Sequence, residues 1–537
     1  MIFQTSFYKS KKLLLIEDCE PVRASIKGML QQIGFEDITT AADALQAIAA
    51  TKKASFDFVL ADFDLGSGQD ALQCFADMHQ QAQLKVACCF LLMSAEPRRL
   101  PVLGALNGAP DAFILKPFSY LELEKRLAKA WNHRLKLRKA YQALRDGDTH
   151  SAQLELDQVI NAHNSSSLLA LRLMGEVLLQ EASFAAAQKL YEQVLQQRDF
   201  SWAQLGKAVA LLQQQEFDIA QSELQQLLGS DDVRPEALQW LAAAFMLQQD
   251  YPQAVQQLNE LVKIQPTNVD AHQAIACALE LDGKYDDAVK CWQKLIQQYR
   301  FSGFDRSEFY FALTRLLLDR ALQCRAADLP AAIKKAADAL SSMPNKLQNE
   351  QTDAAVAVLR ARFDVLQGNY ANAGQQLEQL DAMTLPPKPA CLLDAAALAL
   401  ALGEMKLSEQ YLQLHKEKRL ALTDLIQLCH HQRARHMQLR EPKLRQQIRQ
   451  HNQNGMDLLA QGKATEALNT LNSAFTYMPC NPALLLNMLQ ALTELPADKK
   501  HQPLAKRILS ALEFCSKTAA NQQRLAALLP KLPEVYL

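Results

Sequence analysis

Residues 12–18 read KLLLIED, and this stretch decides the fold of the first part of the chain. Four aliphatic side chains stand in a row and two carboxylates follow, a pattern typical of a strand buried on both faces of a parallel sheet. Similar runs follow at residues 56–61, 85–93 and 112–115, with a weaker one at 38–41. Helical spacing separates them, over residues 21–32, 42–50 and 70–79. This alternation predicts an α/β fold with a doubly wound, five-stranded parallel sheet.

Polar side chains follow the predicted strands where each strand ends. Glu17 and Asp18 follow the first strand, Asp62 the third, Ser94 the fourth and Lys116 the fifth. The carboxyl ends of parallel strands meet at one edge of the sheet, where ligands bind. Three carboxylates there repel one another unless a cation joins them, and Mg²⁺ takes oxygen ligands. With a lysine and a hydroxyl opposite, the set predicts transfer of a phosphoryl group onto a carboxylate.

This order of residues resembles the receiver domain of two-component response regulators, over about residues 10–130. The resemblance implies a flavodoxin-like fold in which Asp62 accepts the phosphoryl group. It also implies that Glu17 and Asp18 hold Mg²⁺ together with Asp62, and that the main-chain carbonyl of Asp64 is a further ligand. The alternative interpretation of these acids is a solvated rim without chemistry.

The same resemblance assigns the remaining site residues. It implies that Ser94 and Lys116 bind the phosphoryl oxygens and that Phe113 is the aromatic residue that changes rotamer on activation. Asp64 and Glu96 lie two residues beyond the acceptor and the serine, at positions that tune dephosphorylation in receivers.

From residue 119 onward the chain is helical and repetitive. Ser119 and Glu122 form a capping box, and no glycine or proline interrupts residues 118–146. The last receiver helix is therefore expected to run straight into the next domain or to join it through a slight bend, without a flexible linker. Beyond it, a small residue returns about every 34 residues, at Ala152, Ala187, Ala220, Ala254 and Ala288.

This spacing resembles the tetratricopeptide repeat (TPR), which implies two antiparallel helices per repeat and an all-α, right-handed superhelix. We expect the receiver domain in residues 1–130 and about five repeats in 131–300. Diverged helix pairs are expected in 301–350 and also over 415–450, and further repeats and closing helices in 351–537. Such an array binds a peptide or a helix and does not catalyse. Gln239, His272 and Gln273, on exposed faces of first helices, are the candidate groove residues.

Two basic stretches, residues 125–139 and 416–449, are interpreted as solvated helix faces. A nucleic-acid surface is the alternative for the first, and an acidic partner or RNA for the second. A cluster of potential ligands within the second is interpreted as a surface cluster and not as a metal site, because its spacing fits no standard site. Its members are Cys429, His430, His431 and His436.

Composition and motif content further limit the expected location, partners and activity of the protein. The 537 residues carry a net charge of −1, and the eleven cysteines form no CxxC pair, as expected of a reduced cytoplasmic protein. No apolar run approaches the roughly 18 residues of a membrane span, so a membrane is not an expected partner. The net charge close to zero gives no reason to expect DNA as a partner. Motifs of common enzyme classes are missing from the sequence. We expect no enzymatic activity beyond slow loss of the phosphoryl group.

The sequence thus predicts a response regulator in a phosphorelay. A sensor histidine kinase or phosphotransfer protein passes a phosphoryl group to Asp62 with Mg²⁺, and this switches binding of an unidentified protein or peptide by the TPR groove. One alternative is a constitutive TPR scaffold whose receiver is only a docking module. The other is an RNA-binding or anti-sigma-type partner switch that uses residues 416–449.

Overall fold

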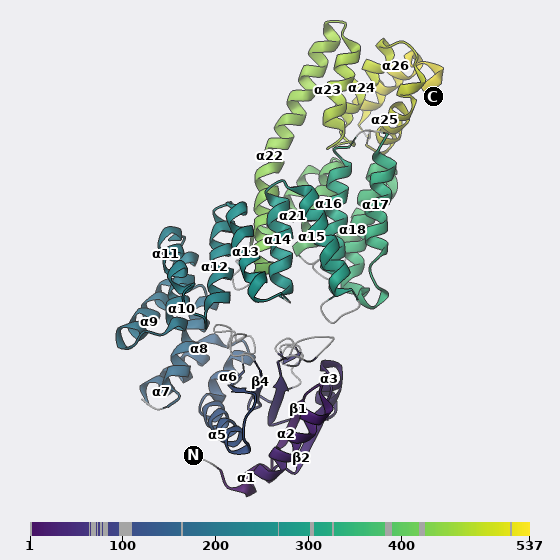
Figure 1. The fold of residues 1–537 in the computed structure, drawn as a ribbon. Helices are drawn as coiled ribbons and strands as arrows, with labels where there is room; N and C mark the ends of the chain where they lie inside the picture. Colours follow the sequence, from purple (N-terminus) through teal and green to yellow (C-terminus); the bar gives the residue numbers. More distant parts are fainter. Residues whose placement is uncertain are drawn as a thin grey trace. The chain divides into compact units, whose positions relative to one another are not determined.

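The computed structural model describes residues 3–536, apart from 64, 66–70, 72–73, 76–77, 79–83, 96–109, 163–164, 267, 301–304, 325–326, 382–388, 418–424 and 516–517. The chain divides into two compact units. The first holds residues 1–272, 299–304 and 421–425, and the second holds residues 273–298, 305–420 and 426–537. Figure 1 labels the helices and strands of both.

A parallel sheet in the order β2-β1-β3-β4-β5 forms the beginning of the first unit. Its strands are β1 (Lys12–Ile16), β2 (Asp37–Ala41), β3 (Phe58–Asp62), β4 (Cys89–Ser94) and β5 (Ala112–Leu115). All four neighbouring pairs run parallel, with Leu13 opposite Phe58 and Asp62 opposite Met93. The predicted five-stranded parallel sheet is confirmed, including its weakest strand.

Alternate strand residues enter two separate cores, one on each face of the sheet. Leu13, Leu15 and Leu60 pack with α2 (Glu20–Ile33), α5 (Tyr120–Lys136) and the short α1 (Thr5–Lys9). Leu14, Ile16 and Val59 pack on the opposite face with α3 (Ala44–Lys53) and with described residues between 71 and 78. Both faces are therefore covered, which explains why the strands are unbroken apolar runs.

One strand and one helix begin later than the sequence predicts. β4 begins at Cys89 and not at Lys85, because its pairing with β3 starts with Cys89 opposite Phe58. The amide of Cys88 donates instead to the carbonyl of Lys85, 2.9 Å away, in a turn. Helix α3 begins at Ala44 because Asp43 caps it, accepting a hydrogen bond from the amide of Gln46.

The receiver-like sheet passes into the helical array with almost no linker. Ser119 caps α5, as predicted, and accepts a hydrogen bond from the amide of Glu122 at 3.3 Å. Helix α5 ends at Lys136 and α6 begins at Arg138, so only the fully buried Leu137 separates them.

Paired helices make up the rest of the first unit. They are α6 (Arg138–Arg145), α7 (Thr149–Asn161), α8 (Ser167–Gln180), α9 (Phe184–Gln197), α10 (Ser201–Gln213), α11 (Phe217–Leu227), α12 (Arg234–Leu247) and α13 (Tyr251–Ile264). Small residues allow the helices to cross closely. Tyr191 of α9 lies over Gly175 and Gly206, where an added Cβ would come within 2.5 and 2.3 Å of its ring or hydroxyl.

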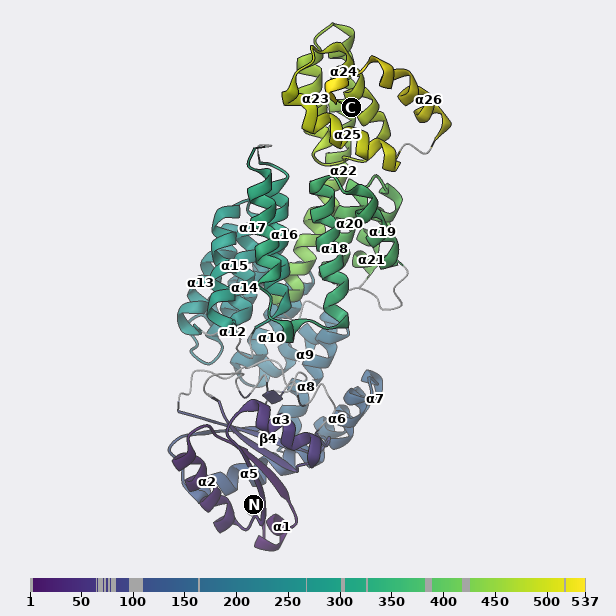
Figure 2. The ribbon, with the colours of Figure 1, turned by 90° about the vertical axis from the view of Figure 1, so that its right-hand side faces the viewer.

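The second unit is also built from paired helices, and Figure 2 shows it from the side. They are α14 (Val269–Leu281), α15 (Tyr285–Tyr299), α16 (Ser307–Ala321), α17 (Leu329–Ser341), α18 (Glu350–Gln367), α19 (Tyr370–Asp381), α20 (Pro389–Ala401), α21 (Met405–Glu417), α22 (Leu425–Ala460), α23 (Ala464–Phe475), α24 (Pro482–Glu494), α25 (Gln502–Cys515) and α26 (Ala519–Leu528). Among the described helices, none combines the length and apolar character that a membrane span requires.

The expectation of diverged helix pairs over residues 415–450 is wrong. Helix α22 runs unbroken for 36 residues, from Leu425 to Ala460. The chain has no glycine between Gly403 and Gly455 to form the turn of a helix pair. Pro442 lies inside α22 without ending it.

The turn between paired helices uses left-handed backbone five residues before the small repeat residue. Glycine occupies this position at Gly147 and Gly283, with φ of +75° and +78°. Ala182, Gln215 and Gln249 adopt the same conformation, with φ of +58°, +68° and +65°. A side chain in this region is strained, because its Cβ approaches the following carbonyl oxygen. The repeats therefore share one turn geometry, although only some of them carry the glycine that suits it.

We predict that Gln249→Gly stabilises the protein by about 0.5–1 kcal/mol, because glycine removes the Cβ strain at this turn. The matched control is Gly283→Ala. An added Cβ there meets no atom within 4 Å, so only the backbone strain changes, with an expected loss of about 1 kcal/mol. Urea unfolding followed by helical circular dichroism measures both variants. A lower midpoint for Gln249→Gly contradicts the shared turn geometry.

Candidate phosphoacceptor site

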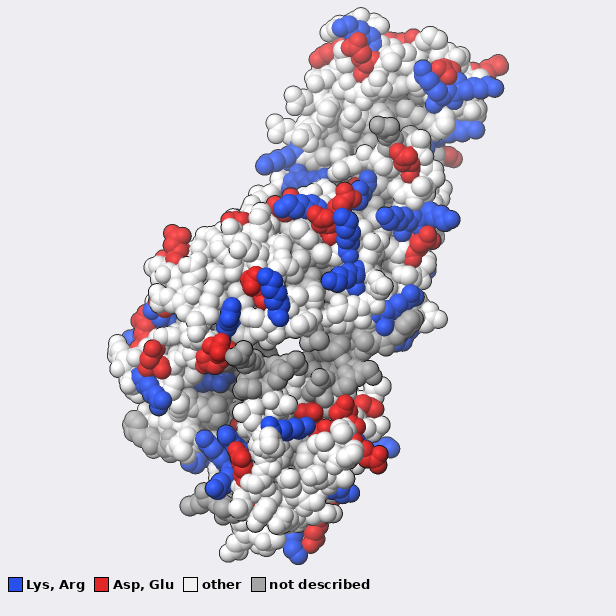
Figure 3. Space-filling view, in the orientation of Figure 1, with Lys and Arg blue, Asp and Glu red and all other residues white. Residues whose placement is uncertain are grey.

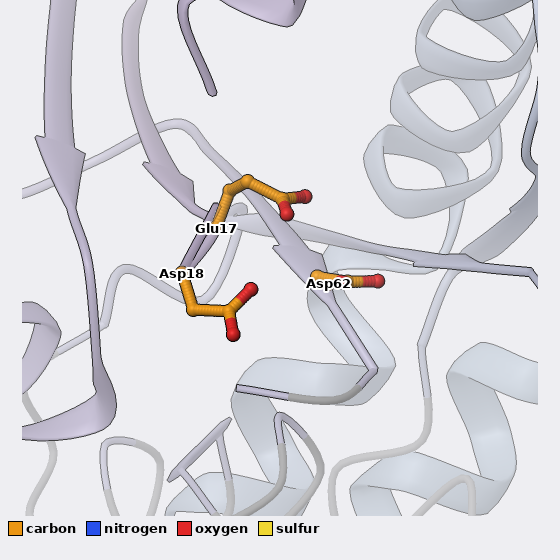
Figure 4. Close-up of side chains that lie close together, drawn as sticks. All are labelled: Glu17, Asp18 and Asp62. Carbon is orange, nitrogen blue, oxygen red and sulfur yellow. The ribbon is translucent and has the colours of Figure 1, made fainter. Parts of the chain in front are cut away.

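Three carboxylates converge at the carboxyl edge of the sheet. Glu17 and Asp18 follow β1 directly, and Asp62 is the last residue of the adjacent strand β3. One carboxylate oxygen from each lies within 4.8 Å of the others, and Figure 4 shows the three side chains together. Glu17 is buried, Asp62 is half-buried and Asp18 is exposed. Hard oxygen donors at this separation, with one side open to water, fit the coordination that Mg²⁺ prefers.

Lys116, directly after β5, supplies a positive charge to these acids. Its Nζ lies 2.7 Å from Oε2 of Glu17 and 3.0 Å from Oδ2 of Asp62. The structure thus brings Lys116 against the carboxylates, and the bond between Lys116 and Pro117 is cis. The amide of Lys116 donates to the carbonyl of Ser94 at 2.8 Å, so the ends of β4 and β5 are joined beside the acids.

The protonation of the three paired groups reflects burial and mutual attraction. Burial raises the pKa of Glu17 and of Asp62, and the hydrogen bonds from Lys116 offset part of this rise. Burial alone lowers the pKa of Lys116, but its hydrogen bonds with Glu17 and Asp62 outweigh burial, and the pKa rises. The lysine therefore stays charged and can attract an anionic group to Asp62.

Asp62 is held in a defined orientation. Its Oδ1 accepts a hydrogen bond from the amide of Phe63 at 2.9 Å, while Oδ2 faces Lys116. Ser94 is buried at the end of β4, and Phe113 is half-buried in β5, against the core that contains Leu92. Asp64 and Glu96 lie outside the described residues, so their assigned roles stay predictions.

Sequence reasoning missed Arg23, in the first turn of α2. Its guanidinium donates to the carbonyl of Glu17 at 2.6 Å and to that of Asp18 at 3.3 Å. These bonds hold the backbone of the acidic pair where it leaves β1. The available signal was a basic residue one helical turn beyond the pair, a pattern too common to single out.

Arg134 in α5 contradicts the expectation of a solvated face over residues 125–139. It was expected on a solvated face but is 8% exposed. Its guanidinium donates to the carbonyl of Cys88 at 3.1 Å, lies 3.3 Å from Asp111 and covers the ring of Tyr141 at 4.0 Å. Residues before β4 and β5 are thereby tied to α6, the helix that follows α5.

Comparison with known proteins identifies the two parts of the chain. Residues 13–128 match the response regulator receiver domain family. The first part is a receiver domain. Residues 205–269 match the tetratricopeptide repeat family, so the array contains TPRs. Together these matches support a response regulator that carries a TPR protein-interaction module.

Individual relatives match the receiver domain. Chemotaxis protein CheY-3 of Vibrio cholerae is 29% identical over 121 residues, which cover 22% of this chain and 92% of that protein. CheY of Pseudomonas aeruginosa is 26% identical over 120 residues, covering 22% and 94%.

Solved structures align with each part of the chain. A tetratricopeptide repeat protein from Parabacteroides merdae covers 52% of this chain and 98% of its own, with 16% identity and a TM-score of 0.35. CheY4 of V. cholerae covers 22% of this chain and 98% of its own, with 27% identity and a TM-score of 0.21.

The predicted groove residues have different environments. Gln239 and His272 are half-buried, and the His272 ring contacts the carbonyl of Pro266 at 3.0 Å. Gln273 is 5% exposed, so its expected place on an exposed face is wrong. It lines a small cavity together with Trp292 of α15 and Cys429 of α22.

Among the described residues, the potential metal ligands that lie close enough together to hold an ion are Glu17, Asp18 and Asp62 of the receiver. The cluster from Cys429 to His436 is not such a group within those residues. Cys429 is buried, contrary to a surface cluster, whereas His431 and His436 are exposed as predicted. The expected solvated face over 416–449 is also wrong at Arg433, which is 9% exposed. Figure 3 shows both signs of charge interspersed on one face, with no broad area of a single sign among the described residues.

Proposed function

We propose that this protein is a phosphorylation-switched adaptor, in which the receiver controls protein binding by the TPR module. The observation that carries the proposal is Asp62 at the end of β3, with two further carboxylates within 4.8 Å and Lys116 at 3.0 Å. The proposed donor is a sensor histidine kinase or a phosphotransfer protein. The proposed ligand of the repeats is another protein or peptide.

In the proposed reaction, a phosphoryl group moves from a phosphohistidine to Asp62. The phosphorus–nitrogen bond of the donor breaks, and an oxygen of the Asp62 carboxylate forms the new bond to phosphorus. Lys116 attracts the incoming anion, and the Phe63 amide fixes the orientation of the carboxylate. Glu17, Asp18 and Asp62 would hold Mg²⁺, which supplies positive charge to the phosphoryl oxygens when it is bound.

A new charge at Asp62 competes for Lys116, which now pairs with Asp62 and Glu17. Lys116 is followed within four residues by α5, and its amide is bonded to Ser94. Movement at this lysine therefore acts on the ends of β4 and β5 and on the start of α5. The Arg134 contacts and the single junction residue Leu137 connect these elements to α6.

We expect labelling of the full-length protein by acetyl phosphate with Mg²⁺ to alter amide hydrogen exchange over residues 116–145. Mass spectrometry of peptides from labelled and unlabelled protein measures this change, and exchange in β1 and β2 serves as the internal control. Labelling that leaves exchange over 137–145 unchanged contradicts the switch and favours the constitutive scaffold.

A further inference from the structure

Helix α22 lies along other helices of the second unit, as Figures 1 and 2 show from two sides. The thiol of Cys277 in α14 contacts the carbonyl of Cys429 at 3.8 Å. Further along, the Gln438 amide donates to the carbonyl of Leu412 in α21 at 3.0 Å. We call the surface that faces this helix, which includes Cys277 and Glu280 of α14 and Leu412 of α21, the α22 groove.

An arginine anchors α22 in this groove. Arg433 donates through Nε to Oε1 of Glu280 in α14 at 3.0 Å, and its NH2 group also bonds to Oε2 of Glu280. Their side chains are 10% and 13% exposed. A buried carboxylate needs a cation, so the groove without α22 would present Glu280 to a basic group of an incoming partner.

The contact between α22 and its groove is incompletely filled. Cavities of about 160, 80 and 30 Å³ lie along it. Met437 and Leu444 from α22 line the largest, together with Leu318 and Leu393 from the repeats. The space left beside Met437 would admit a larger apolar side chain.

Polar groups in the same region are also left unsatisfied. Gln432 is only 1% exposed, and both the nitrogen and the oxygen of its side-chain amide are buried without a hydrogen-bond partner. The side-chain oxygen of Gln273, beside the smallest cavity, is buried without a partner as well. Each such group weakens the docking of α22, because its desolvation is not repaid by a hydrogen bond.

Pro442 divides α22 into two parts. Proline has no amide hydrogen, so the carbonyl of Gln438 has no helical partner there. Beyond it, Asn452 accepts a hydrogen bond from Asn487 at 2.8 Å, and Gly455 packs closely against Leu471, which ties the second part to α23 and α24. The first part, residues 426–441, contacts α14 through Arg433 and α21 through Gln438.

We propose that residues 426–441 occupy the partner site of the second unit, and that the partner is a basic amphipathic helix that replaces them. The partner helix presents an arginine to Glu280 and a larger apolar side chain to the 160 Å³ cavity. This inference rests on the proposed function only in taking the repeats as the binding module. It does not depend on phosphorylation.

Charge reversal in the full-length protein tests this inference, with a fluorescent synthetic peptide of residues 426–441 as the probe. Arg433→Glu places two carboxylates together and releases the internal helix, so the groove becomes free for the peptide. We expect binding about ten-fold or more tighter than to the unaltered protein, whose groove is occupied. Amide exchange over 426–441 should rise while α16 and α18 stay protected.

The reciprocal variant supplies the matched control. Glu280→Arg also releases the internal helix, but it should bind the peptide carrying Arg433→Glu and reject the unaltered peptide. Released protein that binds neither peptide overturns the inference, as does unchanged protection over 426–441 in both variants. If α16 and α18 lose protection in these variants, peptide binding and amide exchange over 426–441 are measured on Gln438→Ala instead. This variant removes only the half-buried hydrogen bond to Leu412, and its result decides. Acetyl phosphate labelling of the variants tests the proposed function separately.

Discussion

Asp62→Asn abolishes Mg²⁺-dependent labelling of the full-length protein by acetyl phosphate. The substitution keeps the size of the side chain and an oxygen that can face Lys116, now 3.0 Å from Oδ2. It removes the carboxylate, and a neutral amide is too weak a nucleophile to take the phosphoryl group. Intact-protein mass spectrometry after incubation at neutral pH measures the labelled fraction, which should fall from substantial to undetectable.

Asp37→Asn is the matched control for this loss. Asp37 begins β2 at the opposite edge of the sheet, half exposed and 3.3 Å from Lys12, so labelling should be unchanged. Asp18→Asn should leave the acceptor in place but raise the Mg²⁺ concentration required, because one carboxylate of the cluster is lost. Persistent labelling of Asp62→Asn would exclude Asp62 as the acceptor.

Asp394→Asn destabilises the second unit by about 3–5 kcal/mol, the largest stability effect we expect. Asp394 in α20 is 4% exposed and bonds to Arg315 of α16 at 2.6 and 2.8 Å and to Arg362 of α18 at 2.7 Å. One carboxylate thus joins three helices. Its removal leaves two buried guanidinium groups that share less negative charge, which is the costly half of breaking a buried pair.

Urea unfolding measures this effect, with Asp286→Asn as control. Asp286 is 75% exposed and pairs with Arg320, so its loss should cost about 0–1 kcal/mol. The pH dependence provides a second readout. Burial alone raises the pKa of Asp394, but its arginine neighbours outweigh burial and hold that pKa below its ordinary value. The Asp394 contribution is therefore present at neutral pH and is lost as the pH falls through this depressed value. Equal stability of both variants at neutral pH contradicts the role.

The candidate site was predictable because its residues sit at strand ends. Once residues 12–16 and 58–62 are parallel neighbours, Glu17 and Asp62 must lie at the same edge, whatever the details of packing. The partner chosen by Lys116 did not follow from this rule. The sequence does not show whether the Lys116 side chain is unpaired or forms ion pairs with Glu17 and Asp62, because the pairing depends on side-chain rotamers.

The errors lie where a charged residue is buried by a tertiary partner distant in sequence. Arg134 and Arg433 are each part of a basic stretch, and local pattern assigns such stretches to solvent. Their partners, Asp111 and Glu280, are 23 and 153 residues away, so only the folded chain brings the charges together. For the same reason, the sequence did not predict the α22 groove.

The one-residue junction at Leu137 also affects where the receiver can be separated from the repeats. Arg134 and Arg145, on either side of Leu137, bond to the carbonyls of Cys88 and Leu84. A receiver cut after residue 130 would lose both and leave the buried Asp111 without its cation. We therefore expect the smallest stably folded receiver fragment to include α6, unlike a receiver that is joined to its neighbour by a flexible linker.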